Sequence, residues 1–285
     1  MGKASKVKVE LRDAIEMAYL IQALKDIADN KFYTLSQQKE KFRRFGETFV
    51  EFFRMISFTK AKHPLLDNDY PTVGILVVTI EGSFLGKFNN RILKLALETK
   101  NNFPNYRFIA VGNKAVDRLR PYTPDLKVFT GMERMGMYEM ALQVKNYLID
   151  EIMNKRLGKV VVIYSWPKTL DVQKERVVNL LPCKELISKQ VQFVDFYEKA
   201  IWESEPVNII GYLANLWVTV RLHEIFLESN IAAAAALASF LEESVDKMKK
   251  EKIKAQMKYR KARKNDIDKS LRETFSARMM SIDAK

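Results

Sequence analysis

Apolar side chains recur at three- and four-residue steps along both ends of the chain. Residues 9–55 contain no proline and one glycine, and their apolar positions from Leu11 to Ala28 follow helical spacing. The last 74 residues, which follow Gly211, contain neither proline nor glycine and carry an intermittent apolar stripe. The pattern predicts a long helix at each end, and the first helix is either continuous or broken near residues 30–34.

The middle of the chain alternates between short β-branched runs and amphipathic segments. Residues 73–80, with the sequence VGILVVTI, are almost entirely apolar, which is typical of a strand buried on both faces. The further expected strands are 106–111, 127–130 and 159–164, and the expected helices are 93–97 and 138–154. This alternation predicts a small α/β domain whose sheet is at least partly parallel.

Turn-forming residues separate this domain from the terminal helices. Prolines and aspartates between His63 and Pro71 stop a helix, because proline lacks a backbone donor and fixes its own φ. A second, polar link runs from Pro182 to Glu205. We therefore expect an N-terminal helix region at 1–62, an α/β domain at 63–204 and a C-terminal helix region at 205–285.

The C-terminal helix needs a partner. At about 1.5 Å of rise per residue, a helix of this length extends well beyond a compact domain of this size. The N-terminal helix is the only other segment of similar length and polarity, so the two are expected to pair as a coiled coil. Charged residues interrupt the apolar stripe between Met257 and Leu271, and there the helix should meet a polar partner rather than a dry seam.

The formal net charge of +13 lies entirely at the two ends of the chain. Residues 1–62 hold 13 Lys+Arg and 8 Asp+Glu, residues 246–285 hold 14 and 6, and residues 63–245 hold 21 of each. Basic ends on a neutral body predict a localised acidic partner rather than general adhesion to nucleic acid or lipid.

The sequence carries no pattern of a membrane anchor, a secretory signal or a metal site. No uninterrupted apolar run is long enough to span a bilayer, and the charged start MGKASKVKVE lacks the apolar stretch of a signal. Cys183 is the only cysteine, and His63 and His223 lie far apart without a second ligand at metal spacing. We expect a cytoplasmic protein with no direct membrane insertion, no metal and no cofactor, in which these three side chains serve packing or lie at the surface.

A glycine-containing turn follows the first expected strand. The segment from Glu81 to Asn89 (EGSFLGKFN) has the position in which glycine-rich loops hold phosphates, but it matches neither the dinucleotide nor the P-loop spacing. A structural turn is therefore favoured over a nucleotide site. Motifs for serine, zinc or cysteine hydrolases are absent from the sequence, so the chain is not expected to be an enzyme by itself.

The basic run from Lys247 to Lys264 has three interpretations. It holds ten Lys or Arg among eighteen residues. A basic helix can bind nucleic-acid phosphates, but Tyr259 is the only aromatic residue in the run that could stack on a base. A solvated helix face is the commonest role of such a run, and a basic shaft held in an acidic protein collar is the third interpretation.

Short motifs along the chain resemble those of one known family. Residues 13–17 (DAIEM) are similar to its Lys-Ala-Met-Glu-Met, and residues 180–182 to its Leu-Leu-Pro. Residues 259–273 (YRKARKNDIDKSLRE) resemble its Tyr-Asn-x-Ala-Arg-Gln-x-x-Ile-Thr-x-Glu. The order of these motifs resembles that of the gamma subunit of F-type ATP synthases, and the resemblance covers essentially the whole chain.

The first strand and its turn resemble the same family with departures. Residues 62–89 correspond to the family's link, first strand and Asp-Arg-Gly-Leu-Cys-Gly-Gly turn, of which Glu81, Gly86 and Asn89 keep part. The residues that depart from the motif are Gly82, Ser83, Leu85 and Lys87. The departures suggest a divergent relative, of the kind that includes the F-type-like ATPases of mollicutes.

The resemblance implies a fold and a role. The fold is an N-terminal helix, a small α/β domain and a long C-terminal helix that returns antiparallel to the first. The role is that of a non-catalytic central rotor shaft, which couples ATP hydrolysis or synthesis in a hexameric ring to rotation. The implied partners are alpha- and beta-like P-loop subunits of the ring and an epsilon-like or membrane-rotor subunit, at the cytoplasmic face of the cell membrane.

The resemblance also implies contact residues. Candidates for contact with the ring are Ile15, Met17, Tyr259, Arg263, Lys264, Asp268 and Ser270, and candidates for contact with a stalk or rotor subunit are Glu81, Gly86 and Asn89. Arg263 keeps the family's arginine, whereas the family's glutamine, threonine and glutamate are replaced. Two alternatives stay open: the same shaft in a motor for gliding motility, and a basic coiled-coil scaffold or nucleic-acid-binding protein.

Overall fold

The chain forms two long helices and one five-stranded sheet. A computed structural model describes residues 3–56, 63–82, 85–183 and 204–283. It separates into two compact units. The helical unit is Met1–Asp29 with Leu237–Lys285, and the α/β unit is Asn30–Ala236.

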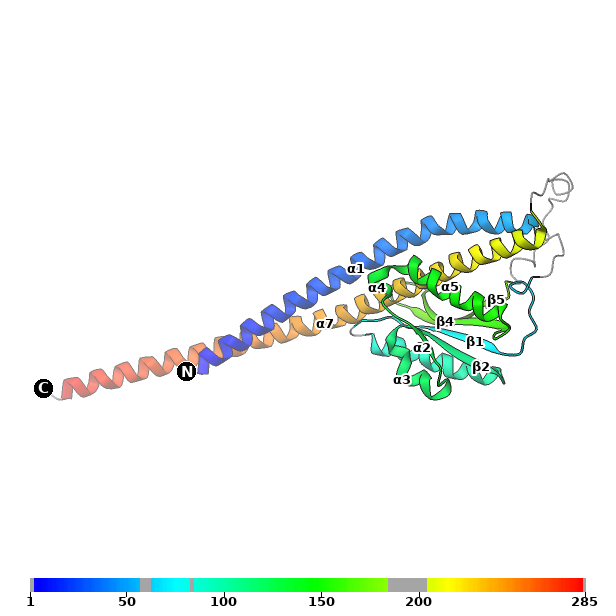
Figure 1. Cartoon of the computed structure of the whole chain (residues 1–285). Coiled ribbons are helices and arrows are strands. Elements are labelled where there is room, and N and C mark those ends of the chain that lie inside the picture. The colour runs from blue at the N-terminus through cyan, green and yellow to red at the C-terminus, as the bar shows by residue number, and fades with distance from the viewer. Residues whose placement is uncertain (1–2, 57–62, 83–84, 184–203, 284–285) are drawn as a thin grey trace. The chain divides into compact units, whose positions relative to one another are not determined.

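The sheet of the α/β unit has the strand order β3-β2-β1-β4-β5 (Figure 1). The strands are β1 Val73–Val78, β2 Tyr106–Val111, β3 Lys127–Phe129, β4 Lys159–Pro167 and β5 Gln173–Leu181. β1 pairs in parallel with β2 and β4, β3 pairs in parallel with β2, and β5 runs antiparallel to β4. The four strands expected from the sequence are confirmed, and the sheet is mixed, as the partly parallel expectation allows.

Strand β5 is the element that the sequence pattern missed. Its sequence, QKERVVNLL, mixes charged and apolar residues without a clean alternation. The strand lies at the edge of the sheet, where charged side chains are typical because they discourage pairing with other chains.

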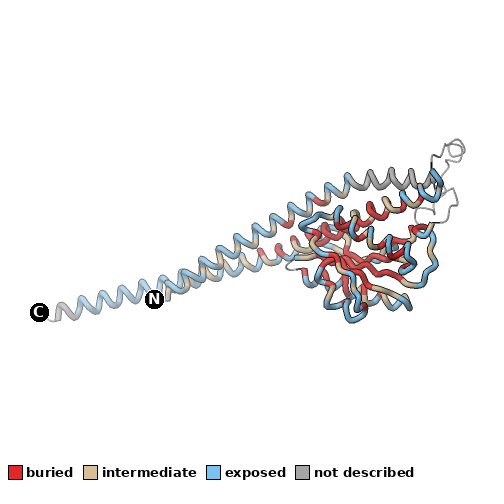
Figure 2. The backbone as a smooth tube through the Cα atoms, viewed as in Figure 1, coloured by how far each residue is buried: buried red, intermediate tan, exposed pale blue. Residues whose placement is uncertain are grey.

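Helices cover the two faces of the sheet. Helix α2 (Gly86–Thr99) joins β1 to β2. Helices α4 (Met132–Met135) and α5 (Met137–Met153) connect β3 to β4, the strand that neighbours β1 on the edge opposite β2. The remaining short helices are α3 (Val116–Leu119) and the 3-10 turns Lys100–Asn102, Asn113–Ala115 and Arg120–Tyr122. All six residues of β1 are buried in the resulting sandwich (Figure 2), as the apolar run predicted.

Neighbouring residues of β5 show which helix covers which face. Glu175 forms an ion pair with Arg91 of α2, and the next residue, Arg176, forms one with Glu228 of the C-terminal helix α7 (Pro206–Asp283). Successive strand side chains point to opposite faces, so α2 and this part of α7 lie on opposite sides of the sheet. The ring of Tyr138, in α5, packs edge-to-face on His223 of α7, which places the start of α5 on the α7 side.

Both terminal helices are longer than any other element. α1 spans Lys3–Ile56 and α7 spans Pro206–Asp283. α1 is continuous through residues 30–34, so the alternative of a break there is wrong. Within the α/β unit, Leu35 of α1 packs with Leu227 and Ile231 of α7, and this burial holds the segment helical.

One stretch of α7 is long and apolar enough to cross a membrane by length and composition alone. An 18-residue segment within Val207–Met279 has a mean hydropathy of 1.4, and 72% of it is buried inside the protein. A buried core helix of a soluble protein has the same length and composition.

The cysteine and the two histidines are packing residues, as expected. Cys183 is 3% exposed, and His223 is half-buried beneath Tyr138. His63 accepts a hydrogen bond from the backbone N–H of Leu65 on Nδ1, at 3.2 Å. Its ring lies against Gly211 of α7, where an added Cβ would be 2.8 Å from Nε2.

Two glycines of the α/β unit allow a matched test of the packing. A Cβ at Gly158 would lie 1.9 Å from the backbone oxygen of Tyr70, whereas a Cβ at Gly86 would meet nothing within 4 Å. We expect Gly158→Ala to lower the free energy of unfolding by about 3 kcal/mol because backbone must move. Gly86→Ala should raise it by about 0.5 kcal/mol. Urea unfolding of both variants checks this, and equal effects would contradict the described packing.

Candidate partner-binding surfaces

The helical unit is held by a thin apolar seam. Ala28 of α1 packs with Ala238 and Leu241 of α7, and Ile21 and Leu237 cover this small cluster. Small residues at the centre of the seam let two helix backbones approach closely. The seam leaves most of the surface of both helices exposed (Figure 2).

Polar contacts mark the first turn of α1. The backbone N–H of Ala4 donates to Asp266 Oδ2 of α7 at 3.2 Å. First-turn N–H groups lack helical partners and carry the positive end of the helix dipole, so a carboxylate is favourable there by about 0.3–1 kcal/mol. Farther along, Lys252 Nζ lies 5.8 Å from the centre of the Tyr19 ring. These contacts fix which part of α7 lies beside α1.

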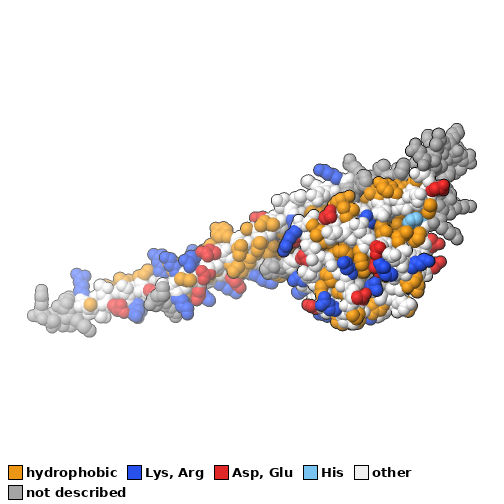
Figure 3. Space-filling view, viewed as in Figure 1, with side chains coloured by type: hydrophobic (Ala, Val, Ile, Leu, Met, Phe, Trp, Pro, Cys, Tyr) orange, Lys and Arg blue, Asp and Glu red, His pale blue; other side chains and the backbone are white. Residues whose placement is uncertain are grey.

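Most of the predicted ring-contact residues point outward on the helical unit. Met17 is 48% exposed. Arg263, Lys264, Asp268 and Ser270 are exposed as well, whereas Ile15 and Tyr259 are half-buried. Figure 3 shows lysine and arginine side chains gathered along the helices of this unit. The predicted residues are thus available for contact with a partner, and Ile15 and Tyr259 also take part in packing.

The last part of α7 is a single helix with an apolar stripe. Residues 263–279 are all exposed, and Ile267, Leu271, Phe275 and Met279 recur at four-residue steps. Their exposed fractions are 50%, 53%, 67% and 66%. Residues four apart lie on one side of a helix, so these side chains form a continuous apolar strip. We call residues 267–279 the tail; no described side chain of α1 covers its stripe.

The predicted turn after β1 lies at the carboxyl edge of the sheet. Asn89 is 3% exposed and closes the turn internally: its Oδ1 accepts from Ile80 N at 3.0 Å, and its Nδ2 donates to Ile80 O at 2.9 Å. Glu81 is half-buried and accepts from Asn113 N at 3.3 Å, and Gly86 is exposed at the start of α2. Ser83 lies outside the described residues. Asn89 therefore positions the turn, Glu81 is half-buried at its start, and Gly86 is exposed.

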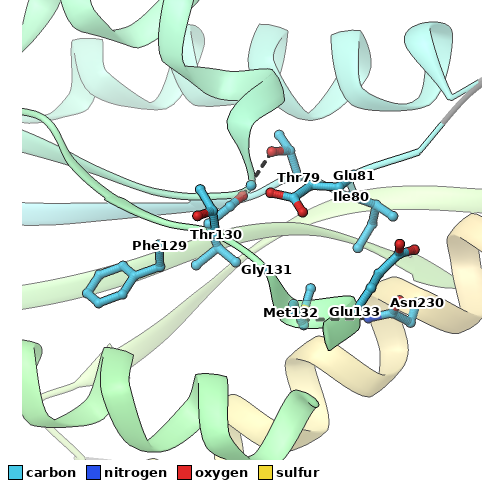
Figure 4. A pocket seen from close by; sticks show the side chains of 11 residues that line it. Thr79, Ile80, Glu81, Phe129, Thr130, Gly131, Met132, Glu133 and Asn230 are labelled. Carbon is cyan, nitrogen blue, oxygen red and sulfur yellow. Dashed lines mark hydrogen bonds between the residues drawn. The ribbon is translucent and has the colours of Figure 1, made fainter. Parts of the chain in front are cut away.

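A small pocket opens beside this turn (Figure 4). It is lined by the ends of β1, β2 and β3 and by Asn230 of α7, and its space of about 250 Å³ includes open solvent. Gly112 brings the end of β2 against β1, since a Cβ there would lie 2.5 Å from Thr79 O. The carboxylates of Glu81 and Glu133 flank the pocket, and none of the described residues that line it is a lysine or an arginine. Two carboxylates repel an anion, so this lining does not suit a phosphate group.

A buried carboxylate joins the sheet to both long helices. The side chain of Glu228, on α7, is 5% exposed. Its Oε1 accepts from Lys39 Nζ of α1 at 2.8 Å, and its Oε2 accepts from Tyr164 OH of β4 at 2.6 Å and from Arg176 of β5. We call these four residues the Glu228 network. Removing one partner of a buried ion pair typically costs about 3–5 kcal/mol, so the network is a strong local constraint.

The charges around Glu228 set its protonation. Burial raises the pKa of Glu228, but hydrogen bonds from Lys39 and Tyr164 and the nearby charge of Arg176 outweigh it, and the pKa lies below its ordinary value. Burial and the charge of Glu228 raise the pKa of the Tyr164 hydroxyl, which stays protonated and donates. Glu228 is thus a carboxylate at neutral pH.

The sequence patterns did not identify the Glu228 network. Lys39 and Glu228 belong to opposite ends of the chain, and Arg176 lies in the strand that was missed. A usable signal was present, because Glu228 is the one acidic residue within the stretch IFLESNI. A charge at an otherwise apolar helix position requires a buried partner.

Comparisons with known proteins agree on one family. The model of the ATP synthase family ATP-synt matches residues 4–278. The ATP synthase gamma chain of Desulfotalea psychrophila is 23% identical over 83% of this chain and 84% of its own length. That of Chlorobium phaeobacteroides is 22% identical over 96% and 97%.

Solved structures share the fold. A chain of the Euglena gracilis mitochondrial ATP synthase, solved with its OSCP, F1 and c-ring, aligns with a TM-score of 0.65 and 15% identity, covering 99% of this chain and 95% of that one. A chain of the Tetrahymena thermophila central stalk and c-ring aligns with a TM-score of 0.56 and 17% identity, covering 79% and 99%. At this level of identity the structural likeness establishes the fold.

The Glu228 network predicts acid sensitivity. The unfolded carboxyl titrates near 4.5 and the folded one lower, so the unfolded chain binds more protons as pH falls. The stabilisation is complete above about pH 4.5 and is lost as pH drops through the folded pKa. We expect Glu228→Gln to lower the free energy of unfolding at pH 7 by about 3 kcal/mol.

Urea unfolding at pH 7 and pH 3.5 measures this difference. Between these pH values the unsubstituted chain should lose more stability than the Glu228→Gln variant. Glu133→Gln is the matched control, because its ion pair with Lys31 is 3.8 Å long and exposed, worth at most about 1 kcal/mol. The same pH dependence in the Glu228 variant and the unsubstituted chain would contradict the assignment.

Proposed function

The chain belongs to the gamma-subunit family of ATP synthases, and we propose that it turns as the central shaft of an F-type or F-type-like rotary ATPase. Its fold has the order that this role requires: two paired terminal helices and an α/β domain between them. Family membership replaces the alternatives of a scaffold and a nucleic-acid-binding protein. By family, the chain is a non-catalytic stalk subunit.

The exposed tail is the observation that carries the proposal. An apolar stripe on a single exposed helix is unfavourable in water, and such surfaces mark contact sites for other proteins. We propose that Leu271 and Phe275 turn inside a hexameric ring of alpha- and beta-like P-loop subunits. The surrounding lysines and arginines would meet acidic loops of that ring.

Weak contacts suit a turning shaft. The predicted ring contacts at Met17, Arg263, Lys264, Asp268 and Ser270 are exposed on the helical unit, and Ile15 and Tyr259 are half-buried there. Exposed ion pairs contribute about 0–1 kcal/mol each, so they break and re-form easily. Basic side chains spread along a helix thus favour retention in the ring without locking one angle.

Coupling requires asymmetry. A ligand shared by three equivalent catalytic sites changes their relative affinities only if it contacts them differently. Two unequal helices joined by a thin seam present a different surface to each side. Rotation of that surface would bring each site in turn through its nucleotide-binding states.

The α/β domain would face the rest of the rotor. We propose that Glu81 and Gly86 contact an epsilon-like or membrane-rotor subunit, while Asn89 holds their turn in place. By function the chain then has three regions: the N-terminal helix region 1–62, the α/β domain 63–204, which would lie outside the ring, and the C-terminal helix region 205–285. The complex would lie at the cytoplasmic face of the cell membrane, with this chain peripheral and not inserted.

The first test is recovery of the complex. The tagged chain, purified from its own cell extract at moderate salt, should bring down P-loop subunits in about three-fold excess of each kind, together with ATPase activity. Membrane-ring subunits in the same complex would indicate a synthase, and their absence a soluble motor such as one for gliding. Recovery of the chain alone, or with nucleic acid, would disprove the proposal.

The second test separates coupling from assembly. We expect Arg263→Ala to lower torque or coupled ATP hydrolysis while assembly weakens by no more than about five-fold, because an exposed pair contributes at most about 1 kcal/mol. Lys94→Ala, at an exposed basic residue of α2 in the α/β unit, is the control and should change neither quantity. Single-molecule rotation provides the torque, and unchanged torque in Arg263→Ala would refute a role for this arginine.

A further inference from the structure

Three described contacts hold helix α1 within the α/β unit. Leu35 packs against Leu227 and Ile231 of α7, with Phe32 and Met137 beside them. Lys31 Nζ lies 3.8 Å from Glu133 Oε1 of α4, with both side chains exposed. Lys39 Nζ lies 2.8 Å from Glu228 Oε1.

These contacts differ in how they resist twisting. Apolar burial is non-directional, so a helix that turns slightly about its axis keeps much of that contact. The exposed Lys31–Glu133 pair is weak. Hydrogen bonds weaken steeply when the donor–hydrogen–acceptor angle departs from linear, and charge-assisted hydrogen bonds are the strongest. The Glu228 network is therefore the directional element among the three.

The geometry of Glu228 joins three parts of the unit at one carboxylate. Its two oxygens take donors from α1 on one side and from β4 and β5 on the other. The guanidinium carbon of Arg176 is itself held, 4.9 Å from the centre of the Tyr164 ring and 5.0 Å from that of Trp166. If α7 turned about its axis, Glu228 would lose donors from both sides at once.

We propose that Glu228 is the torsional joint of the rotor: a positioning residue that locks α1 and α7 to the sheet, so that torque on the α/β domain reaches both shaft helices without slip. This inference rests on the proposed rotary function and assigns a residue to one step of it. Lys39 is the contact that includes α1 in the joint, and Arg176 and Tyr164 anchor it to the sheet.

Angular stiffness of the assembled complex tests the joint. The ring is fixed, rotation is stalled in one nucleotide-bound state, and a bead is attached through Lys168→Cys in the exposed turn between β4 and β5. The angular variance of the bead is then measured. Glu228→Gln should raise this variance about two-fold or more, since the buried pair is the strongest of the three contacts. Glu175→Gln is the matched control: it makes the same chemical change, but its ion pair joins β5 to α2 and includes neither shaft helix.

Two results would overturn the proposal. One is a variance in Glu228→Gln equal to that of the unsubstituted complex. The other is an equal increase in Glu175→Gln, because that would reflect general loosening of the α/β unit rather than a joint.

Hydrogen exchange in the free full-length chain provides a second readout, which does not depend on the ring. Lys39→Met keeps the apolar stem of the side chain and removes the charge. Amides of α1 around Leu35 and Lys39 should then exchange about ten-fold faster, as they should in Glu228→Gln, with no change in Glu175→Gln. Unchanged exchange in Lys39→Met would overturn the joint, whereas failure of the unsubstituted chain to assemble with a ring would overturn the rotary function.

Discussion

A single helix as long as α7 cannot bury its own apolar side chains, so the structure depends on the elements that pack against it. Leu227 and Ile231 pack on α1 within the α/β unit, and Ala238 and Leu241 pack on α1 within the helical unit. After Asp266, the apolar side chains in the described part of α7 are exposed to solvent. One helix thus serves as a core element, half of a coiled coil and an exposed tail, and its pattern of apolar residues changes accordingly.

The fold was largely predictable because its strongest signals are local. An apolar β-branched run such as VGILVV has few structures open to it besides a buried strand, and a stretch of 74 residues without glycine or proline has few besides a helix. The continuity of α1 near residue 32 and the presence of β5 were not predictable in this way. The first depends on a partner distant in sequence, because α7 covers Leu35 of α1. The second pairs with its neighbour β4, but its mixed charged and apolar sequence hides the strand pattern.

The functional surfaces also divide into those that a short sequence motif predicts and those that only the structure reveals. The candidate ring contacts came from a resemblance in short motifs, and the exposed positions of Met17 and Arg263 make them accessible, as such contacts require. The Glu228 network came from the structure, because no pattern in a single sequence pairs Lys39 with a carboxylate on the other terminal helix. Asn89 shows a third case, since its place in a family motif reflects a buried hydrogen-bonding role within the turn.

The two units of this chain place opposite demands on polar interactions. Inside the α/β unit, a carboxylate is removed from water and held by three donors, and such an arrangement is costly to break. On the helical unit, most of the charges are exposed and individually weak. In the proposed rotor, the shaft helices must be held firmly to the α/β domain but must turn freely inside the ring, and this requires both kinds of contact in one molecule. Weak contacts at the α/β domain would let the helices turn against the sheet, and strong contacts with the ring would oppose rotation.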